Sequence, residues 1–232
     1  ITLVISGLIF MMVVSVRDSV SYTINDVIFA ILDANVTMVL EEPQRIDHLE
    51  ELTLAYPNVE RIEMWALSNP SIRPQGQAES EDDESLTLFG VPLPTELYGY
   101  QLRAGRWLDP GDTYALVLNE KLAGEIEVGV GDWVTLQYDD THQRDWLVVG
   151  LVFDPILAQS ANVPREILLR DLHMVGRAST VWIRTAQTDM ASEQATAKGL
   201  REYYAQLGIP VSAQRGVFGI GGDSTKETAS AF

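Results

Sequence analysis

The pattern of apolar and polar residues changes several times along the chain, and its first segment is apolar on every side. Residues 1–16 contain no charged side chain. As a helix they would span roughly 24 Å, less than the ~30 Å hydrocarbon core of a bilayer. We interpret them as the end of a transmembrane helix that belongs to a longer apolar segment. A buried core helix is the alternative interpretation.

Residues 17–34 continue the helical pattern but become amphipathic. Their apolar positions follow one stripe, formed by Val16, Val20, Ile24, Val27, Ile31 and Ala34. No glycine or proline separates this stripe from the apolar start. An apolar helix that becomes amphipathic without a break is typical of a membrane helix that continues into water, because only one of its faces stays covered. We therefore predict a stalk helix over residues 17–34.

A strand–helix–strand pattern occurs twice, in segments far apart. The first unit is predicted as a strand at 36–41, a helix that begins at Pro43, and a strand at 59–66. The second is predicted as a strand at 180–184, a helix at 189–207 and a strand at 210–214. The expected apolar helix faces are Ile46, Leu49, Leu52 and Tyr56, and then Ala197, Leu200, Tyr203, Tyr204 and Leu207. Gly208 is expected to end the second helix in the left-handed conformation. This repeat predicts an α+β fold in which two βαβ units, residues 35–68 and 178–215, form one subdomain interrupted by an insertion.

The insertion, residues 85–177, has the pattern of a β-rich module. Strands are predicted at 114–118, 133–138 and 146–153, with a tight turn at 129–132 and helices at 120–126 and 165–172. Asn119 can cap the first of these helices, since its side-chain oxygen can accept a backbone N–H. Pro155 should end the last strand, because proline has no N–H for the ladder.

Two further segments are polar and carry few apolar residues. Residues 69–84 contain two prolines and end in an acidic run, so we predict a mobile acidic linker. Calcium binding by the run is the alternative, although the alternating ligands and glycine of a calcium loop are missing. The run consists of Glu79, Glu81, Asp82, Asp83 and Glu84. Residues 216–232 are rich in glycine and then polar, and we expect a hinge toward a second membrane helix.

The charge balance argues against nucleic acid as a partner. The formal charge is -17, with 33 acidic and 16 basic residues, whereas nucleic acid requires a basic face. There is no cysteine, so disulfides and thiolate metal sites are excluded.

The residues that could carry out catalysis or bind a ligand are each explained by an ordinary structural role. The histidines, His48, His142 and His173, lack the spacing of metal ligands on one helix. The carboxylates Asp109, Asp112 and Asp132 stand beside glycine or proline, where aspartate commonly caps turns. Trp107, Trp133, Trp146 and Trp182 are expected to pack in the core. Residues 221–226 contain the letters of a phosphate loop in the wrong order, so we expect no ATP binding. We therefore assign no catalytic, cofactor-binding or metal residue.

The order of motifs in residues 104–155 resembles a known family. The run AGRWLDPGDTYALVLNEKLAGEI, followed by VGVGDWVTL and WLVVGLVFDP, is similar to the extracytoplasmic domain of MacB/FtsX-type ABC transporter permeases. The resemblance implies a porter-like pair of βαβ units, a β-rich sabre-like insertion and a stalk helix. It also implies a domain outside the bacterial cell membrane that couples ATP-driven movement of membrane helices to an external substrate or partner protein. The expected partners are a cognate ATPase outside this region and a second permease copy.

Two other functions remain open at the level of sequence. One is a membrane-anchored secreted hydrolase with a carboxylate pair, because carboxylates are plentiful and their separation cannot be read from sequence. The other is a solute-binding module, which would require a sizeable apolar pocket with a few polar groups.

Overall fold

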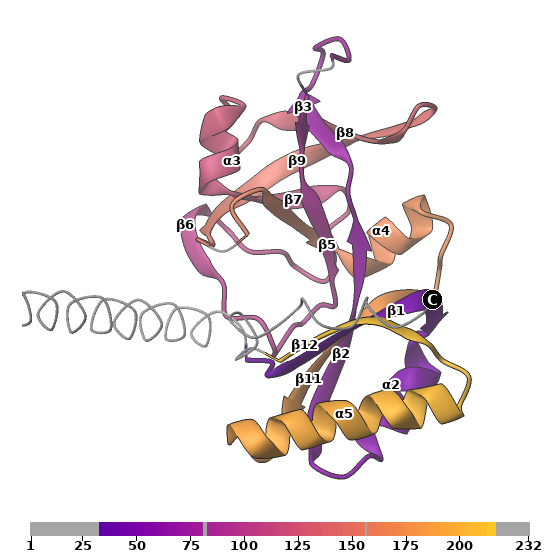
Figure 1. Cartoon of the computed structure of the whole chain (residues 1–232). Coiled ribbons are helices and arrows are strands. Elements are labelled where there is room, and N and C mark those ends of the chain that lie inside the picture. Colours follow the sequence, from indigo (N-terminus) through magenta and orange to yellow (C-terminus); the bar gives the residue numbers. More distant parts are fainter. Residues whose placement is uncertain (1–32, 81–82, 156, 217–232) are drawn as a thin grey trace, which may run out of the picture.

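The computed structural model describes residues 33–80, 83–155 and 157–216, the last five of them by their backbone only. Within these residues 12 strands form one sheet, in the order β12-β1-β11-β2-β5-β10-β7-β9-β8-β3-β4, with β6 paired to β9. The strands β12, β1, β11 and β2 with two helices form what we call the ferredoxin-like half. The remaining strands, which lie between β2 and β11 in the sequence, form the inserted half (Figure 1).

The two strand–helix–strand units interleave in the ferredoxin-like half. Its strands are β1 (Val36–Arg45), β2 (Val59–Ser68), β11 (Arg177–Thr185) and β12 (Val211–Gly216). β11 lies between β1 and β2 and is antiparallel to both, and β12 is antiparallel to β1. The two strands within each unit are therefore parallel, as in the ferredoxin-like split βαβ arrangement. The pairing confirms the predicted fold, in which the two units form one body interrupted by an insertion.

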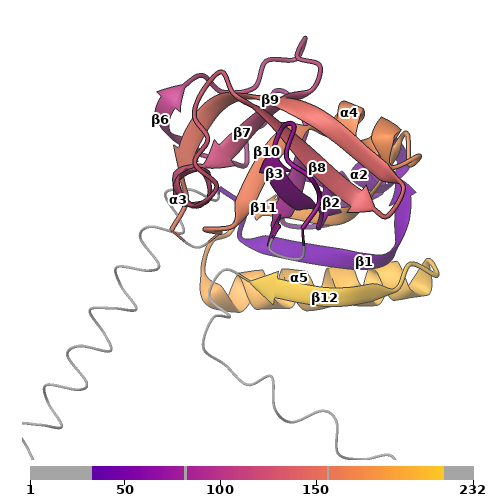
Figure 2. The ribbon, with the colours of Figure 1, turned by 90° about the horizontal axis from the view of Figure 1, so that it is seen from above.

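Two helices, α2 (Ile46–Leu54) and α5 (Met190–Gln206), cover one face of these strands (Figure 1). The buried side chains at this interface are Met38, Met64 and Val181 from the strands, Leu49 from α2, and Leu200 and Tyr204 from α5. Asp189 caps α5 by accepting the N–H of Ser192, and Gly208 follows it with a φ of 74°, as predicted. Figure 2 shows α5 and β12 running along one side of the molecule.

The inserted half contains the short strands that the alternation predicted, and several more. They are β3 (Ser71–Pro74), β4 (Glu84–Ser85), β5 (Thr87–Val91), β6 (Gln101–Gly105), β7 (Ala115–Asn119), β8 (Trp133–Asp139), β9 (His142–Phe153) and β10 (Ser160–Pro164). The helices α3 (Glu120–Glu125) and α4 (Arg165–Asp171) complete it. Asn119 caps α3, since its Oδ1 accepts the N–H of Lys121 at 2.9 Å. Leu116, Leu118, Val134, Leu136 and Trp146 are buried in its core.

The segment predicted as a mobile linker contains two of these strands. β3 pairs with β8 and with β4, so residues 71–74 and Glu84 belong to the sheet. Ile72 and Arg73 are buried, and Arg73 forms an ion pair with Asp83 at 3.0 Å. The polar composition indicated a solvated segment, but these side chains have partners that lie far away in the sequence.

Three smaller predictions also require correction. Pro43 lies within β1, beside a shift in strand register, and α2 begins only at Ile46. Residues 160–164 form the buried strand β10, where no strand was predicted. Leu207, predicted on the buried face of α5, is 45% exposed because the helix ends before it.

The membrane-related predictions lie mainly outside the described residues. This applies to residues 1–16, to the stalk up to residue 32, and to residues 217–232 with their phosphate-loop letters. Asp33 and Ala34, the last two residues of the predicted stalk, are not helical. Among the residues that the structure does describe, no helix has the length and apolar character needed to cross a membrane.

Candidate functional site at the junction of the two halves

The two ends of the described chain meet at one edge of the ferredoxin-like half. Val36, the first residue of β1, is paired with Gly216, the last residue of β12. The segment that enters the domain and the segment that leaves it are therefore neighbours in the sheet. A displacement of either segment acts directly on β1, which is hydrogen-bonded to β12 on one side and to β11 on the other.

The entering residues are held by both halves of the molecule. The N–H of Asp33 donates to the carbonyl of Leu97 in the inserted half at 3.0 Å. The N–H of Asn35 donates to the carbonyl of Ile183 in β11, also at 3.0 Å. Ala34, between them, is buried. The entry segment is thus in contact with both halves at once.

Asn35 anchors the entry segment through a buried hydrogen-bond network. Its Nδ2 donates to Thr185 Oγ1 at 2.7 Å and to Glu193 Oε1 at 2.8 Å, and its Oδ1 accepts the N–H of Thr185 at 2.9 Å. Burial raises the pKa of Glu193, while the Asn35 hydrogen bond acts in the opposite direction. Because Glu193 lies in the first turn of α5, this network fixes the start of β1 to the helix that covers it.

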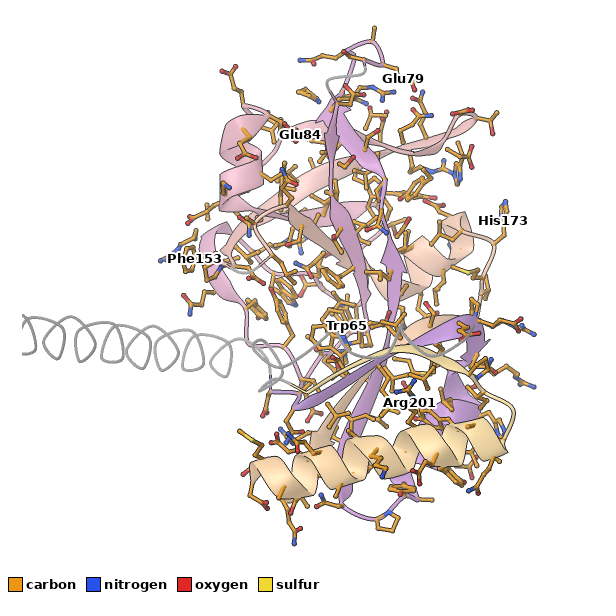
Figure 3. The ribbon with its side chains drawn as sticks, in the orientation of Figure 1. Trp65, Glu79, Glu84, Phe153, His173 and Arg201 are labelled. Atoms are coloured by element: carbon orange, nitrogen blue, oxygen red, sulfur yellow. The ribbon has the colours of Figure 1, made fainter. Side chains whose placement is uncertain are left out.

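An aromatic group, which we call the junction cluster, fills the space between the two halves. Its buried members are Ala34, Trp65, Val91, Leu97, Tyr98 and Trp182. The rings of Trp65 and Trp182 stack at 4.0 Å with an angle of 10°. Trp65 also makes edge contacts with Tyr98 at 5.8 Å and with Phe89 at 6.1 Å. Figure 3 shows Trp65 where the two halves meet, and it packs against side chains from both of them.

A buried carboxylate fixes the loop that carries part of this cluster. Glu63 is 8% exposed and accepts four hydrogen bonds. The donors are Trp65 Nε1, Thr95 Oγ1 and the backbone N–H groups of Glu96 and Leu97, at 2.6–3.1 Å. A buried carboxylate is costly unless it is fully hydrogen-bonded. Glu63 therefore ties β2 of the ferredoxin-like half to residues 95–97 of the inserted half.

Tyr98 extends the connection deeper into the inserted half. Its hydroxyl hydrogen-bonds with the side chains of Asp154 and Asn162. Asp154 directly follows β9, and Asn162 lies in β10. Burial, with the nearby charge of Asp154, raises the pKa of Tyr98 above its ordinary value, so the phenol stays protonated. The side chains from Ala34 through the junction cluster to Asp154 thus form a continuous path.

The residues considered from sequence lie elsewhere and have mainly structural roles. Asp112 accepts two bonds from Arg106 at 2.7 Å, which lower its pKa, and Asp132 accepts the N–H of Gly129 at 2.8 Å. The rings of His142 and His173 stack at 6.4 Å, a proximity that sequence spacing did not indicate. Within the described ranges no group of three or more potential ligands could hold a metal ion.

The tryptophans divide between the core and the surface. Trp146 and Trp182 are buried as predicted, and Trp107 is partly buried, but Trp133 is 44% exposed. Trp65, which was not considered from sequence, is fully buried at the centre of the junction cluster. Its position in β2 next to Met64 gave the only signal. Since neighbouring strand residues face opposite sides, two large apolar residues in succession indicate a strand buried on both faces.

This fold is one that is known from domains outside the cytoplasm. The chain is similar to the crystal structure of the periplasmic region of MacB from Actinobacillus actinomycetemcomitans, with a TM-score of 0.56 and 14% identity over 82% of this chain and 92% of that one. It is also similar to the extracellular domain of the noncanonic ABC-type transporter YknZ from Gram-positive bacteria, with a TM-score of 0.55 and 14% identity over 78% of this chain and 100% of that one. No family model and no curated protein matches the sequence. At a sequence identity of 14%, the structural similarity to these two domains shows that the fold is shared.

Proposed function

We propose that this chain is the extracytoplasmic domain of a MacB/FtsX-type ABC transporter permease in the bacterial cell membrane. Its role would be to couple ATP-driven movement of membrane helices to a substrate or partner protein outside the membrane. The observation that carries the proposal is the pairing of Val36 with Gly216, which places the entering and leaving segments side by side. The shared fold with the MacB and YknZ domains supports the same assignment.

The geometry suggests how movement would reach the inserted half. A pull on the entry segment acts on Ala34 and Asn35, which contact the junction cluster and the Glu193 network. The interior of a protein is close-packed and transmits strain, so the junction cluster would move with the entry segment. Glu63 and Tyr98 would then carry the displacement into the inserted half, where an external partner would be bound.

The proposal includes parts that lie outside the described residues. Residues 1–16 would be the end of a transmembrane helix, residues 17–34 largely a stalk, and residues 216–232 a hinge toward a second membrane helix. Residues 35–68 and 178–215 would form the porter-like subdomain and residues 85–177 the sabre-like one. Because β3 and β4 pair within the inserted sheet, residues 69–84 would move with the sabre-like part.

The proposed partners follow from the same assignment. A cognate ATPase would supply the energy, and a second permease copy would complete a dimer. The domain would act on an extracytoplasmic substrate or protein. This domain itself would carry out no reaction. ATP hydrolysis would occur on a chain or region other than this one.

A flexible insertion in the full-length transporter tests the coupling. A Gly-Ser segment inserted after Val16 should abolish transport while leaving expression and basal ATP hydrolysis largely intact, because the stalk would no longer transmit force. The same segment inserted after Asp140, in the exposed turn between β8 and β9, is the matched control and should leave transport unchanged. Full transport by the Val16 variant would rule out the stalk as the transmitting element.

A further inference from the structure

A small cavity lies at the end of β1 opposite to the entry segment. At this end β1 runs into α2 (Figure 1). The cavity has a volume of about 180 Å³, and it is lined by Gln44, Arg45, His48, Leu49, Arg177 and Ile209. The floor is apolar, since Leu49 and Ile209 are only 1% and 8% exposed. The rim is formed by polar and cationic side chains, in a chain whose formal charge is -17.

The two arginines of this cavity stand in an unfavourable position when nothing is bound. Arg45 of β1 and Arg177 of β11 are directly paired across antiparallel strands. Like charges at directly opposite positions destabilise a sheet. Such a pair is better explained if an anion bridges the two guanidinium groups.

The neighbouring carboxylates do not neutralise this pair. Among the described residues, neither Arg45 nor Arg177 forms an ion pair, although most other arginines do. Asp47, in the first turn of α2, is the nearest carboxylate in the sequence and contacts neither arginine as an ion pair. His48 follows Arg45 by three residues, which places both on the same side of the chain as it enters the helix. The cavity therefore presents two uncompensated charges and an imidazole above an apolar floor.

We propose that this cavity binds the phosphate group of a small phosphate ester or of a lipid headgroup. Guanidinium groups offer paired N–H donors that match phosphate oxygens, and two of them balance the roughly −1.5 to −2 charge of a phosphate monoester. The first turn of α2 adds a favourable dipole. The apolar floor of Leu49 and Ile209 suits the carbon atoms next to the phosphate. This binding site does not depend on the transport role proposed above.

Thermal unfolding of the full chain, at constant ionic strength with and without inorganic phosphate or phenyl phosphate, tests the site. Both ligands should raise the unfolding temperature of the wild type, because a ligand that binds the folded state stabilises it. The double variant R45Q/R177Q should show no such rise. R177Q alone should bind phenyl phosphate about tenfold more weakly or worse, as expected for a lost charged hydrogen bond. K198Q, which removes one exposed positive charge from α5, should behave as the wild type.

Two comparisons separate binding from a general effect on folding and identify the source of the phosphate. Without ligand, R177Q should unfold at the same temperature as the wild type or higher, because the repulsion with Arg45 is removed. Sedimentation with vesicles of phosphatidylcholine, with and without phosphatidic acid, reports on the lipid. Capture by phosphatidic acid that requires both arginines assigns the phosphate to a headgroup, whereas a response to the free esters alone assigns it to a soluble ligand. Equal responses of wild type and double variant in every arm would overturn the proposal.

Discussion

Single buried polar side chains set the properties of the junction. Glu63 accepts four hydrogen bonds and the Asn35 side chain takes part in three, and both connect segments that are distant in the sequence. Glu193 differs, because the residue is only 4% exposed and its carboxyl accepts a hydrogen bond from a neutral amide, that of Asn35. A carboxylate in that position is penalised by the loss of water without a compensating positive charge. The stability of the junction should therefore depend on the protonation of Glu193.

The raised pKa of Glu193 predicts a specific dependence of stability on pH. The folded state binds this proton more tightly than the unfolded chain, so the carboxyl contributes stability below its ordinary pKa. That contribution is lost as the pH rises through the folded-state value. Glu193→Gln is neutral throughout, so the free energy of unfolding of this variant relative to the wild type should be higher at pH 7 than at pH 4. Urea titrations at the two values measure it.

The control for this experiment is Glu51→Gln, which removes an exposed carboxylate from α2. It allows the loss of one negative charge to be subtracted from the effect of burial. If the difference between Glu193→Gln and the wild type were the same at both pH values, the carboxyl would not be titrating between the folded and unfolded states in this range.

At the scale of the elements, α5 packs unusually close to the end of α2. A methyl group at Gly199 in α5 would lie 2.2 Å from the hydroxyl oxygen of Tyr56. Glycine in the middle of a helix normally costs about 0.5–1 kcal/mol relative to alanine. The close approach explains why glycine is nevertheless suitable at this position.

Gly199→Ala should therefore destabilise the protein although alanine favours the helix. Overpacking typically costs about 1–3 kcal/mol, which exceeds the gain in helix propensity. Gly124→Ala in α3, where nothing lies within 4 Å of the added methyl group, should instead stabilise by about 0.5–1 kcal/mol. Adding Tyr56→Phe to Gly199→Ala removes the clashing oxygen and should restore most of the loss. Chemical denaturation of the four proteins provides the comparison, and a stable Gly199→Ala single variant would show that Tyr56 moves aside freely.

Elements with a local signal were predictable, whereas elements that depend on distant partners were not. The cap at Asn119 and the left-handed Gly208 follow from neighbouring residues alone. β10 could not be predicted in this way, because its five buried residues contain a serine, an asparagine and a proline. β10 lies between β5 and β7 in the sheet and is paired with both of them. The same reason applies to Arg73, which donates to Gln137 and Gln143, and to Glu63, which accepts the N–H of Glu96. These partners are 33 to 70 residues away in the sequence.

At the scale of the whole molecule, β2 makes one sheet out of the two halves. Trp65 of β2 is paired with Thr180 of β11, and the next residue, Ala66, is paired with Gly90 of β5. The Nη1 of Arg165 in α4 adds a hydrogen bond to the carbonyl of Met64 at 2.8 Å. Two apolar clusters accompany these backbone contacts. Met64 and Ala66 of β2 belong to the main core together with Leu88 and Leu168 of the inserted half, and the junction cluster is the second connection. We expect the halves to unfold together only while that cluster is intact.

Trp65→Ala should separate the unfolding of the two halves. Truncation of a buried tryptophan costs about 3–5 kcal/mol, and here the resulting cavity lies between the halves. Amide hydrogen exchange can follow the β1–β11 pair and the β8–β9 pair independently. In the wild type the most protected amides of both pairs should exchange with the same opening free energy. In Trp65→Ala those values should diverge. Trp133→Ala, which removes a tryptophan that is 44% exposed, should keep them equal. Equal opening free energies in Trp65→Ala as well would mean that the continuous sheet, and not the junction cluster, holds the two halves together. The path proposed for mechanical coupling would then run through β2 alone.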